Sequence, residues 1–560
     1  MVMPMIENQV IQFRERQQID EYNSRVQTGL NNNFYEPNLN LWLTMKTRPP
    51  AFLTNAEFAS ALTKKYIKNI NIAEKKKDGQ VFTPLEIANY MAGMIELPKS
   101  DFTLIDPGAG TGILLAAVCD RIIAEAKRPL SVQITAYETD EKIISCLEAC
   151  LEKCKSTLSE KGHTLNPTIV NSDFIKDNIH RLDNFQDENT HNLHSYDIII
   201  ANPPYQKLPR LSQLRGLLPE IIFGRTNLYG IFIALGITLL KDNGQFVFFT
   251  PRSYCSGQYH KKIRELLLNN SCIKTIHSFE SRHNIFEEHD VLQEVIILHG
   301  VKTHEKKCSP INVQSTLSQS LEHIQSITVP YSYIVPKKNP ILNIHIPQTK
   351  NDRKIIDTVQ SWENSLGGLG FRISTGKVVD FRAKQYLRVS AEDPSTVPLL
   401  WMQNVKNGQI DWPLPNFKKP QYFVSCESTK AKLVPVQNYV LLRRFSSKEE
   451  KKRIQAFPFI ASQFSDYPVI GFENHLNYLY RINGVLSLEE TYGFSAFLNS
   501  PMIDRYYRML SGNTQVNSSD LMNLPLPKLD TIIEIGMCFT DDHYDPIHNN
   551  KIIEKILRKS

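Results

Sequence analysis

Short apolar runs alternate with stretches of helical periodicity through the first half of the chain. The runs occupy residues 102–105, 131–137, 168–170, 196–201, 245–250, 273–279 and 291–299. Strands that alternate with helices are typical of βαβ units and of a largely parallel sheet. The last two runs leave little room for a helix between them, so we expect the sheet to end in an antiparallel hairpin. The pattern therefore predicts an α/β domain over residues 71–305.

The pattern changes on both sides of this α/β region. Residues 1–70 are mostly polar with scattered apolar positions, which predicts a helical N-terminal segment. Residues 306–345 are rich in Ser, Thr and Pro and weakly patterned, so we expect a linker there. Aromatic residues, short strand patterns and turn dipeptides dominate residues 346–530, which predicts a separate mixed α+β domain. Residues 531–560 predict a short helical tail.

Composition narrows the class of protein. A chain of 560 residues is too long for one ordinary domain, and 41% hydrophobic with 22% charged residues is globular. The apolar stretch at 231–240 is too short to cross a bilayer, and residues 1–30 hold no apolar signal core. Nine cysteines without a Cys-x-x-Cys pair favour a reduced, cytoplasmic protein without a metal site. The net charge of +6 permits a polyanionic partner.

The first chemical signal is a glycine-rich turn at residues 106–112, Asp-Pro-Gly-Ala-Gly-Thr-Gly. It follows an apolar run and precedes a helical one, which is the geometry of a nucleotide-binding crevice. No Gly-Lys-Ser/Thr follows, and Gly-x-Gly-x-x-Gly is absent, which weighs against a phosphate loop and against NAD. An acid at the strand end favours a cationic group, and the ammonium of S-adenosylmethionine fits. The candidate cofactor residues here are Asp106, Gly108, Gly110 and Gly112.

Two further strand ends carry acids in the same order along the chain. Glu138 follows the second run, where a carboxylate can accept from the two hydroxyls of a ribose. Asp173 and Phe174 follow the third run. A carboxylate can accept from the adenine amino group, and an aromatic ring can stack on the base. We expect all three residues to bind the cofactor.

The most specific motif is Asn202-Pro203-Pro204-Tyr205, at the end of the fourth run. Two prolines cannot continue a strand, so they fix a turn at the carboxyl edge of the sheet, where ligands bind. The amide oxygen of Asn202 and the carbonyl of Pro203 can both accept from an exocyclic amine, which makes its nitrogen nucleophilic. Tyr205 can stack on the base that carries this amine. Methylation of an amine also requires no strong base, because the proton leaves after the methyl group arrives.

The order of these motifs resembles the gamma-type N6-adenine DNA methyltransferases of bacterial type II restriction–modification systems. Residues 79–84 look like the family's cofactor-lid motif, with Thr83 at a cofactor-contacting position. Residues 227–232 resemble the next motif, with Phe232 at the adenine end of the cofactor pocket, and 249–253 resemble the strand-end segment after it. Phe286 matches the place of a second aromatic that packs on the extruded base. The resemblance implies a Rossmann-like S-adenosylmethionine-dependent methyltransferase domain.

The resemblance extends to a C-terminal target-recognition domain. Its signatures match residues 373–379, 444–450, 473–477 and 512–517. The segment 443–453 holds six basic and two acidic residues, so Arg443, Arg444 and Lys448 are candidates for phosphate contact. Asn and Gln suit adenine in the major groove, which makes Asn513, Gln515 and Asn517 candidate base readers. These residues can equally cap a turn.

The resemblance implies adenine-N6 methylation of a short duplex DNA sequence by base flipping, with S-adenosylhomocysteine as the second product. A separate cognate restriction endonuclease is the expected partner, and a monomer is a plausible state. N4-cytosine methylation is an alternative that uses the same mechanism, since cytosine also presents an exocyclic amine. A protein-glutamine or RNA methyltransferase is a further alternative, and the large second domain weighs against the former. We find no nuclease motif in the sequence, which argues against a restriction enzyme fused to a methyltransferase. The intact cofactor and catalytic motifs argue against a catalytically silent DNA-binding module.

Overall fold

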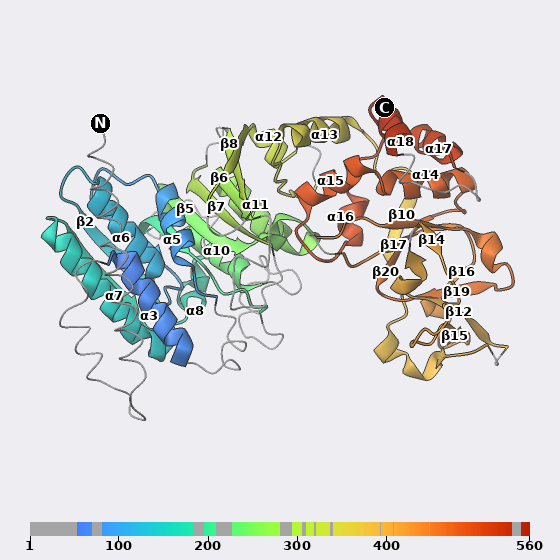
Figure 1. The fold of residues 1–560 in the computed structure, drawn as a ribbon, viewed down its shortest axis with the longest axis horizontal. Helices are drawn as coiled ribbons and strands as arrows, with labels where there is room; N and C mark the ends of the chain where they lie inside the picture. The colour runs from blue at the N-terminus through green and yellow to red at the C-terminus, as the bar shows by residue number, and fades with distance from the viewer. Residues whose placement is uncertain are drawn as a thin grey trace, which may run out of the picture. The chain divides into compact units, whose positions relative to one another are not determined.

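The computed structural model describes residues 53–69, 81–182, 195–208, 227–279, 294–304, 310–317, 321–336, 340–391, 394–406, 408–446, 449–539 and 550–559. All the elements below belong to one compact unit, Thr54–Ser560 (Figure 1). We call residues 54–346 the sheet domain and residues 350–559 the C-terminal domain. None of the helices within the described ranges is long and apolar enough to cross a membrane.

A nine-stranded sheet organises the sheet domain, with strand order β3-β2-β1-β4-β5-β7-β6-β8-β9. The strands β1 to β5 run parallel, whereas β7 lies antiparallel between β5 and β6. This confirms the predicted α/β class with an antiparallel hairpin of β6 and β7. The strands are β1 Phe102–Asp106, β2 Ser131–Tyr137, β3 Thr164–Val170, β4 Tyr196–Ala201, β5 Leu240–Pro251, β6 Ser271–Phe279, β7 Val295–Lys302, β8 Ile311–Thr316 and β9 Gln325–Val329.

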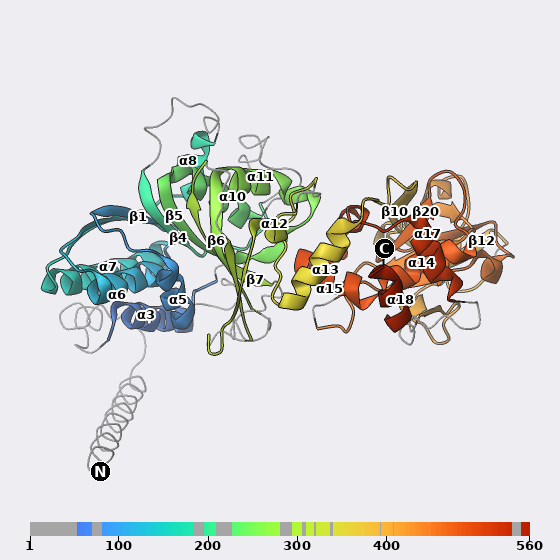
Figure 2. The same cartoon turned by 90° about the horizontal axis from the view of Figure 1, so that it is seen from above.

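Helices cover both faces of the sheet (Figure 2). Neighbouring residues of a strand point to opposite faces, so Leu104 packs in one core and Ile105 in the other. The first core includes helices α3 Asn55–Asn69, α5 Leu85–Met94, α6 Ile113–Glu125 and α7 Glu141–Glu160. The second includes α8 Phe174–Asn178, α10 Leu228–Leu239 and α11 Lys261–Asn270. Cys150 and Cys154 of α7 are buried in the first core.

The end of this domain differs from the sequence expectation. The hairpin is not the last part of the sheet, because β8 pairs parallel with β6 and β9 pairs antiparallel with β8. Both strands lie in the segment 306–345 that was expected to be a linker. In addition, Cys272 of β6 is disulfide-bonded, in contrast to the fully reduced state that the cysteine pattern predicts.

The C-terminal domain combines small sheets with helices. A four-stranded sheet has the order β10-β20-β17-β18, and a five-stranded sheet has the order β11-β15-β12-β19-β16. The strands of the first sheet are β10 Phe371–Thr375, β17 Tyr439–Arg443, β18 Ala456–Phe459 and β20 Leu476–Arg481. Those of the second are β11 Leu387–Arg388, β12 Thr396–Leu400, β15 Tyr422–Val424, β16 Leu433–Pro435 and β19 Val469–Phe472. The helices are α13 Lys350–Ser361, α14 Leu488–Leu498, α15 Pro501–Leu510, α16 Ser518–Met522, α17 Leu529–Met537 and α18 Asn550–Leu557.

The two last helices belong to this domain rather than forming the separate tail expected at 531–560. Ile532 and Ile535 of α17 and Ile553 of α18 are buried in the core that also holds side chains of α14 and α15. The hydrophobic core of the C-terminal domain therefore includes the last described helix.

Candidate active site and recognition motifs

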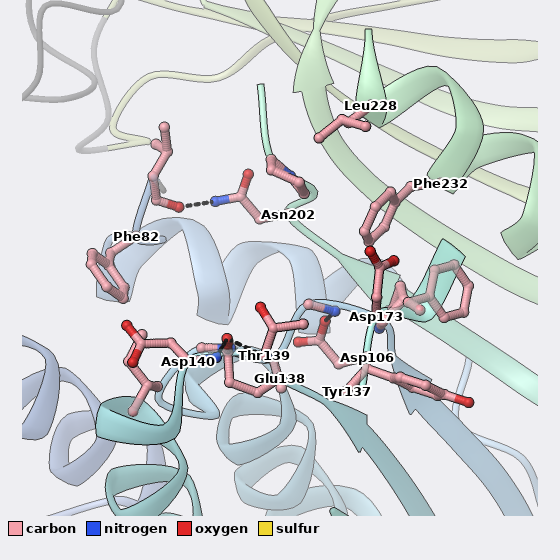
Figure 3. Close-up of a pocket in the computed structure, with 18 of the residues that line it drawn as sticks. Phe82, Asp106, Tyr137, Glu138, Thr139, Asp140, Asp173, Asn202, Leu228 and Phe232 are labelled. Atoms are coloured by element: carbon pink, nitrogen blue, oxygen red, sulfur yellow. Dashed lines mark hydrogen bonds between the residues drawn. The ribbon is translucent and has the colours of Figure 1, made fainter. Parts of the chain in front are cut away.

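A pocket of about 850 Å³ lies at the carboxyl edge of the parallel strands (Figure 3). The edge is the usual ligand position in such sheets, because loops and helix starts converge there. Ten of the residues predicted from the sequence line it, from six separate segments: Thr83, Asp106, Gly108, Gly110, Glu138, Asp173, Phe174, Asn202, Pro204 and Phe232. The fold thus assembles most of the predicted cofactor and catalytic residues around one cavity.

Asp106 ends β1 with a carboxylate that is fully buried. One oxygen accepts from the backbone N–H of Gly108 at 3.0 Å, and the other has no hydrogen-bond partner among the described residues. Burial is the main cause that raises the pKa of Asp106 to about 7, against the lowering effect of the Gly108 N–H. A buried acid without a second partner fits a ligand that carries a positive charge.

Glu138 fixes the glycine turn to the end of β2. Its Oε2 accepts from the backbone N–H of Gly110 at 2.9 Å. Its Oε1 accepts from the backbone N–H groups of Thr139 and Asp140 at 2.8 and 2.9 Å. A carboxylate has about four acceptor sites, so capacity for about one further donor remains on Glu138. Burial raises the pKa of this group, against those backbone hydrogen bonds.

Asp173, Phe174 and Phe232 form a second wall. The Asp173 side chain caps α8 by accepting from the backbone N–H of Ile175 at 2.9 Å. The ring of Phe174 lies 5.1 Å from that of Phe232 and 5.3 Å from that of Tyr137. This side of the pocket therefore presents aromatic surface with a carboxylate beside it, which suits a planar heterocycle.

Asn202 lies directly after β4 with its side-chain amide in a fixed orientation (Figure 3). Its Nδ2 donates to the carbonyl of Val81 at 2.8 Å and to Thr83 Oγ1 at 3.1 Å. Because a backbone carbonyl only accepts, these contacts place the nitrogen on the side of Val81 and Thr83. The buried Oδ1 has no hydrogen-bond partner among the described residues.

Three predicted residues lie near the pocket without lining it. Gly112, at φ 87°, is the N-cap of α6 and packs against α7. Pro203 is buried, and Tyr205 is half-buried with its ring 6.5 Å from that of Tyr229. The base-stacking role of Tyr205 stays a prediction, and Phe286 lies outside the described residues.

Tyr66 is a pocket residue that sequence reasoning missed, whereas Phe82 lines the pocket from within the predicted lid motif at residues 79–84. Tyr66 comes from α3, where its hydroxyl donates to Asp140 Oδ2 at 2.6 Å, and its ring meets that of Phe82 edge to face at 5.7 Å. The sequence alone leaves the role of the segment 1–70 open. The only signal was the spacing of Phe58, Leu62 and Tyr66, which repeats every four residues and marks one helix face.

The four recognition-domain motifs meet in one region of the C-terminal domain. Thr375 Oγ1 donates to Asn477 Oδ1 at 2.9 Å, which joins the first motif to the third. Arg444 donates from Nη1 to the carbonyl of Asn474 at 3.0 Å, and its own carbonyl accepts from Val516 N at 2.7 Å. Segments far apart in sequence therefore surround Arg444.

The candidate DNA-binding residues differ in their surroundings. Arg443 pairs with Gln455 at 3.0 Å, whereas Lys448 lies outside the described residues. Asn513 and Gln515 are half-buried. Asn517 precedes α16 as its N-cap residue but makes no side-chain capping hydrogen bond to the helix backbone, and its Nδ2 donates to Asp520 Oδ2 at 3.2 Å. The DNA roles of these residues stay predictions.

Comparisons with known proteins show which proteins this chain resembles. The Eco57I restriction-modification methylase family matches residues 112–286. The type II methyltransferase M.PstI of Providencia stuartii is 33% identical over 489 residues, which cover 86% of this chain and 94% of that protein. The type II methyltransferase M.BsuBI of Bacillus subtilis is 34% identical over 466 residues, covering 83% and 90% respectively. A DrdV–DNA complex covers 86% of this chain and 59% of its own, with 14% identity and a TM-score of 0.48.

The fold and the pocket define a Rossmann-like methyltransferase with an added C-terminal domain. The chain belongs to the type II DNA methyltransferases of restriction–modification systems. Membership implies S-adenosylmethionine as the cofactor. The pocket residues fit this molecule, because they offer an unsatisfied buried acid, a backbone-fixed carboxylate and an aromatic wall.

Proposed function

We propose that this protein methylates the N6 amino group of adenine within a short sequence of duplex DNA. The observation that carries this proposal is the orientation of the Asn202 amide. Its nitrogen is held by Val81 and Thr83, so its buried oxygen is left to accept from an amino group of the target base. An exocyclic amine supplies the donor that this oxygen lacks.

The chemistry follows from this acceptor and from the turn that carries it. The Asn202 oxygen and the carbonyl of Pro203 accept the two amino hydrogens, which draws the nitrogen lone pair out of conjugation with the ring. Bound S-adenosylmethionine supplies an electrophilic methyl group. After methyl transfer, the nitrogen loses a proton to solvent.

The target base must leave the duplex to reach Asn202, because a stacked base hides its amino group from any pocket. Flipping costs a few kcal/mol, which stacking and edge hydrogen bonds must offset. We assign the stacking to Tyr205 and, by resemblance, to Phe286. We also propose that a separate restriction endonuclease acts in the same system, so that methylation protects host DNA from it.

Mass spectrometry of nucleosides tests the reaction. The purified protein is incubated with unmethylated genomic DNA and S-adenosylmethionine, and the DNA is then digested. We expect N6-methyladenine, and sequencing for modified bases then maps the site. N4-methylcytosine would contradict the adenine assignment while keeping the amine mechanism. The absence of any methylated nucleoside, with cofactor still bound, would contradict DNA as the substrate.

A further inference from the structure

A buried arginine of the sheet domain reaches into the C-terminal domain. Arg252 directly follows β5, and its Nη1 forms an ion pair with Glu294 Oε2 at 3.0 Å, with side-chain exposures of 7% and 4%. Its Nη2 donates to the carbonyls of Arg508 at 2.9 Å and Met509 at 2.5 Å. A buried ion pair is costly unless further hydrogen bonds satisfy its groups. Here the C-terminal domain supplies those acceptors.

The two carbonyls belong to the last turn of α15. The final carbonyls of a helix have no partners within the helix, and this end carries partial negative charge. The guanidinium of Arg252 therefore caps α15 from the neighbouring domain. The Met509 carbonyl also accepts from the backbone N–H of Ile346 at 2.9 Å, again from the sheet domain.

The chain that leaves α15 carries the candidate base readers Asn513, Gln515 and Asn517. Its Gly512 lies so close to the ion pair that an added Cβ would be 2.9 Å from Glu294 Oε2 and 3.0 Å from Arg252 Cδ. On the other side, the buried guanidinium of Arg453 donates to the carbonyls of Ser511 and Asn513. One arginine from each domain thus holds the start of this segment.

Contacts also continue from Arg252 toward the Asn-Pro-Pro-Tyr turn. The next residue, Ser253, shares a hydrogen bond with the hydroxyl of Tyr229, which also accepts from Asn227 Nδ2 at 2.6 Å. The ring of Tyr229 lies edge to face with that of Tyr205 at 6.5 Å. A chain of packed groups therefore joins the end of α15 to the turn that presents Asn202.

We propose that Arg252 is a positioning residue that couples DNA recognition to methyl transfer. It fixes the segment 511–517 relative to Asn202, so that a duplex held by the C-terminal domain delivers its target base to the pocket. This inference rests on the proposed action on duplex DNA. It does not depend on which base accepts the methyl group.

The test is Arg252→Lys, with a duplex oligonucleotide that contains a site methylated by the unaltered protein. Lysine keeps the charge but lacks the planar fork that spans Glu294 and two carbonyls. We expect the single-turnover rate of tritium transfer from labelled S-adenosylmethionine to fall roughly tenfold to a hundredfold, as small misplacements of reacting groups do. Affinities for the duplex and for the cofactor should stay close to those of the unaltered protein.

Arg505→Lys is the matched control. Arg505 also lies on α15, and it pairs at 2.7 Å with the buried Asp352 of α13, within the C-terminal domain. We expect Arg505→Lys to lower Tm. Any fall in its transfer rate should be accompanied by a proportional fall in DNA affinity. The coupling role is wrong if Arg252→Lys keeps the normal rate, or loses rate only in proportion to DNA or cofactor affinity.

Glu294→Gln covers the case in which Arg252→Lys does not fold. It keeps the shape of the side chain and removes the charge that holds the guanidinium, so we expect a smaller loss of the same kind. A normal transfer rate in this variant would contradict the proposal. A wrong adenine assignment can be recognised separately, because the unaltered protein would then make a different methylated nucleoside. The comparison of transfer rates between the variants would still be valid.

Discussion

The side chain of Asn202 combines a fixed nitrogen with an oxygen left to accept a hydrogen bond. Asn202→Ala removes this acceptor, and loss of one such group at a reacting centre typically costs about 10²–10³ in rate. We expect methyl transfer to fall by at least this factor. Cofactor affinity, measured by calorimetry, should change little, because the acids and aromatic rings of the pocket remain. Unchanged turnover would rule out amino-group activation by Asn202.

Asp106 leads to a prediction about pH. Burial raises its pKa to about 7, so it is largely neutral below that pH and a carboxylate above it. A cationic ligand favours the carboxylate, so affinity for S-adenosylmethionine should rise with pH through about 7, by up to roughly tenfold per unit on the acid side. Calorimetric titrations between about pH 6 and 8 measure this.

The matched variant for this test is Asp106→Asn, which keeps the size of the side chain and cannot ionise. It should bind the cofactor more weakly and remove most of the pH dependence in this window. Glu138 also has a raised pKa, and it remains in the variant. An equal pH dependence in both proteins would assign the effect to Glu138 or to another group.

At the scale of elements, Gly112 shows how one residue serves packing at the edge of the site. It has φ 87° and begins α6, and an added Cβ would be 2.9 Å from Leu147 Cδ1 and 3.1 Å from Cys150 Sγ. Gly112→Ala should therefore destabilise the protein by about 1–3 kcal/mol through backbone strain and overpacking. Chemical denaturation measures this change.

Gly93 provides the comparison, because it lies in the helix α5 with nothing within 4 Å of an added Cβ. Gly93→Ala should stabilise the protein by about 0.5–1 kcal/mol, since alanine loses less conformational entropy in a helix. If both substitutions change the free energy of unfolding equally, the expected steric clash and backbone strain at Gly112 are absent.

The strands β1 and β4 were predictable because each is a compact apolar run, whereas only the last three residues of β3 were predicted. The strand β8 was not predictable, because its buried positions include the hydroxyl side chains of Ser315 and Thr316. The strand β9 was not, because Val329 is its only buried residue. Thr316 is buried with its Oγ1 at 3.1 Å from His277 Nε2, and the carbonyl of Gln314 accepts from Ser278 Oγ. Buried polar groups that are satisfied by hydrogen bonds look like linker residues in a sequence. The predicted linker was therefore placed over part of the sheet.

At the scale of the whole molecule, motif order identified the pocket but not everything around it. Strand-end residues of a parallel sheet meet at one edge, so Asp106, Glu138 and Asn202 could be placed together from sequence. No such rule predicts that Tyr66 reaches Asp140, which lies 74 residues away. Nor does charge alone distinguish Arg453 from Arg444, although Arg453 is buried and bonded to backbone carbonyls.

Arg444 supplies the last prediction, which concerns the complex with DNA. It lies where the recognition motifs meet. Its guanidinium donates to the carbonyl of Asn474 and lies 5.8 Å from the ring of Phe445, and we expect its positive charge also to bind a phosphate. Each phosphate contact releases condensed counterions, so Arg444→Ala should weaken binding and reduce the slope of log affinity against log salt by about 1. Arg558→Ala removes the same charge from an exposed position directly after the last helix, where Arg558 pairs with Glu554. Its slope should match that of the unaltered protein, as measured by fluorescence anisotropy over a salt series. If Arg444→Ala keeps the full slope while Tm falls, Arg444 has a structural role in joining the motifs and does not contact the backbone of DNA.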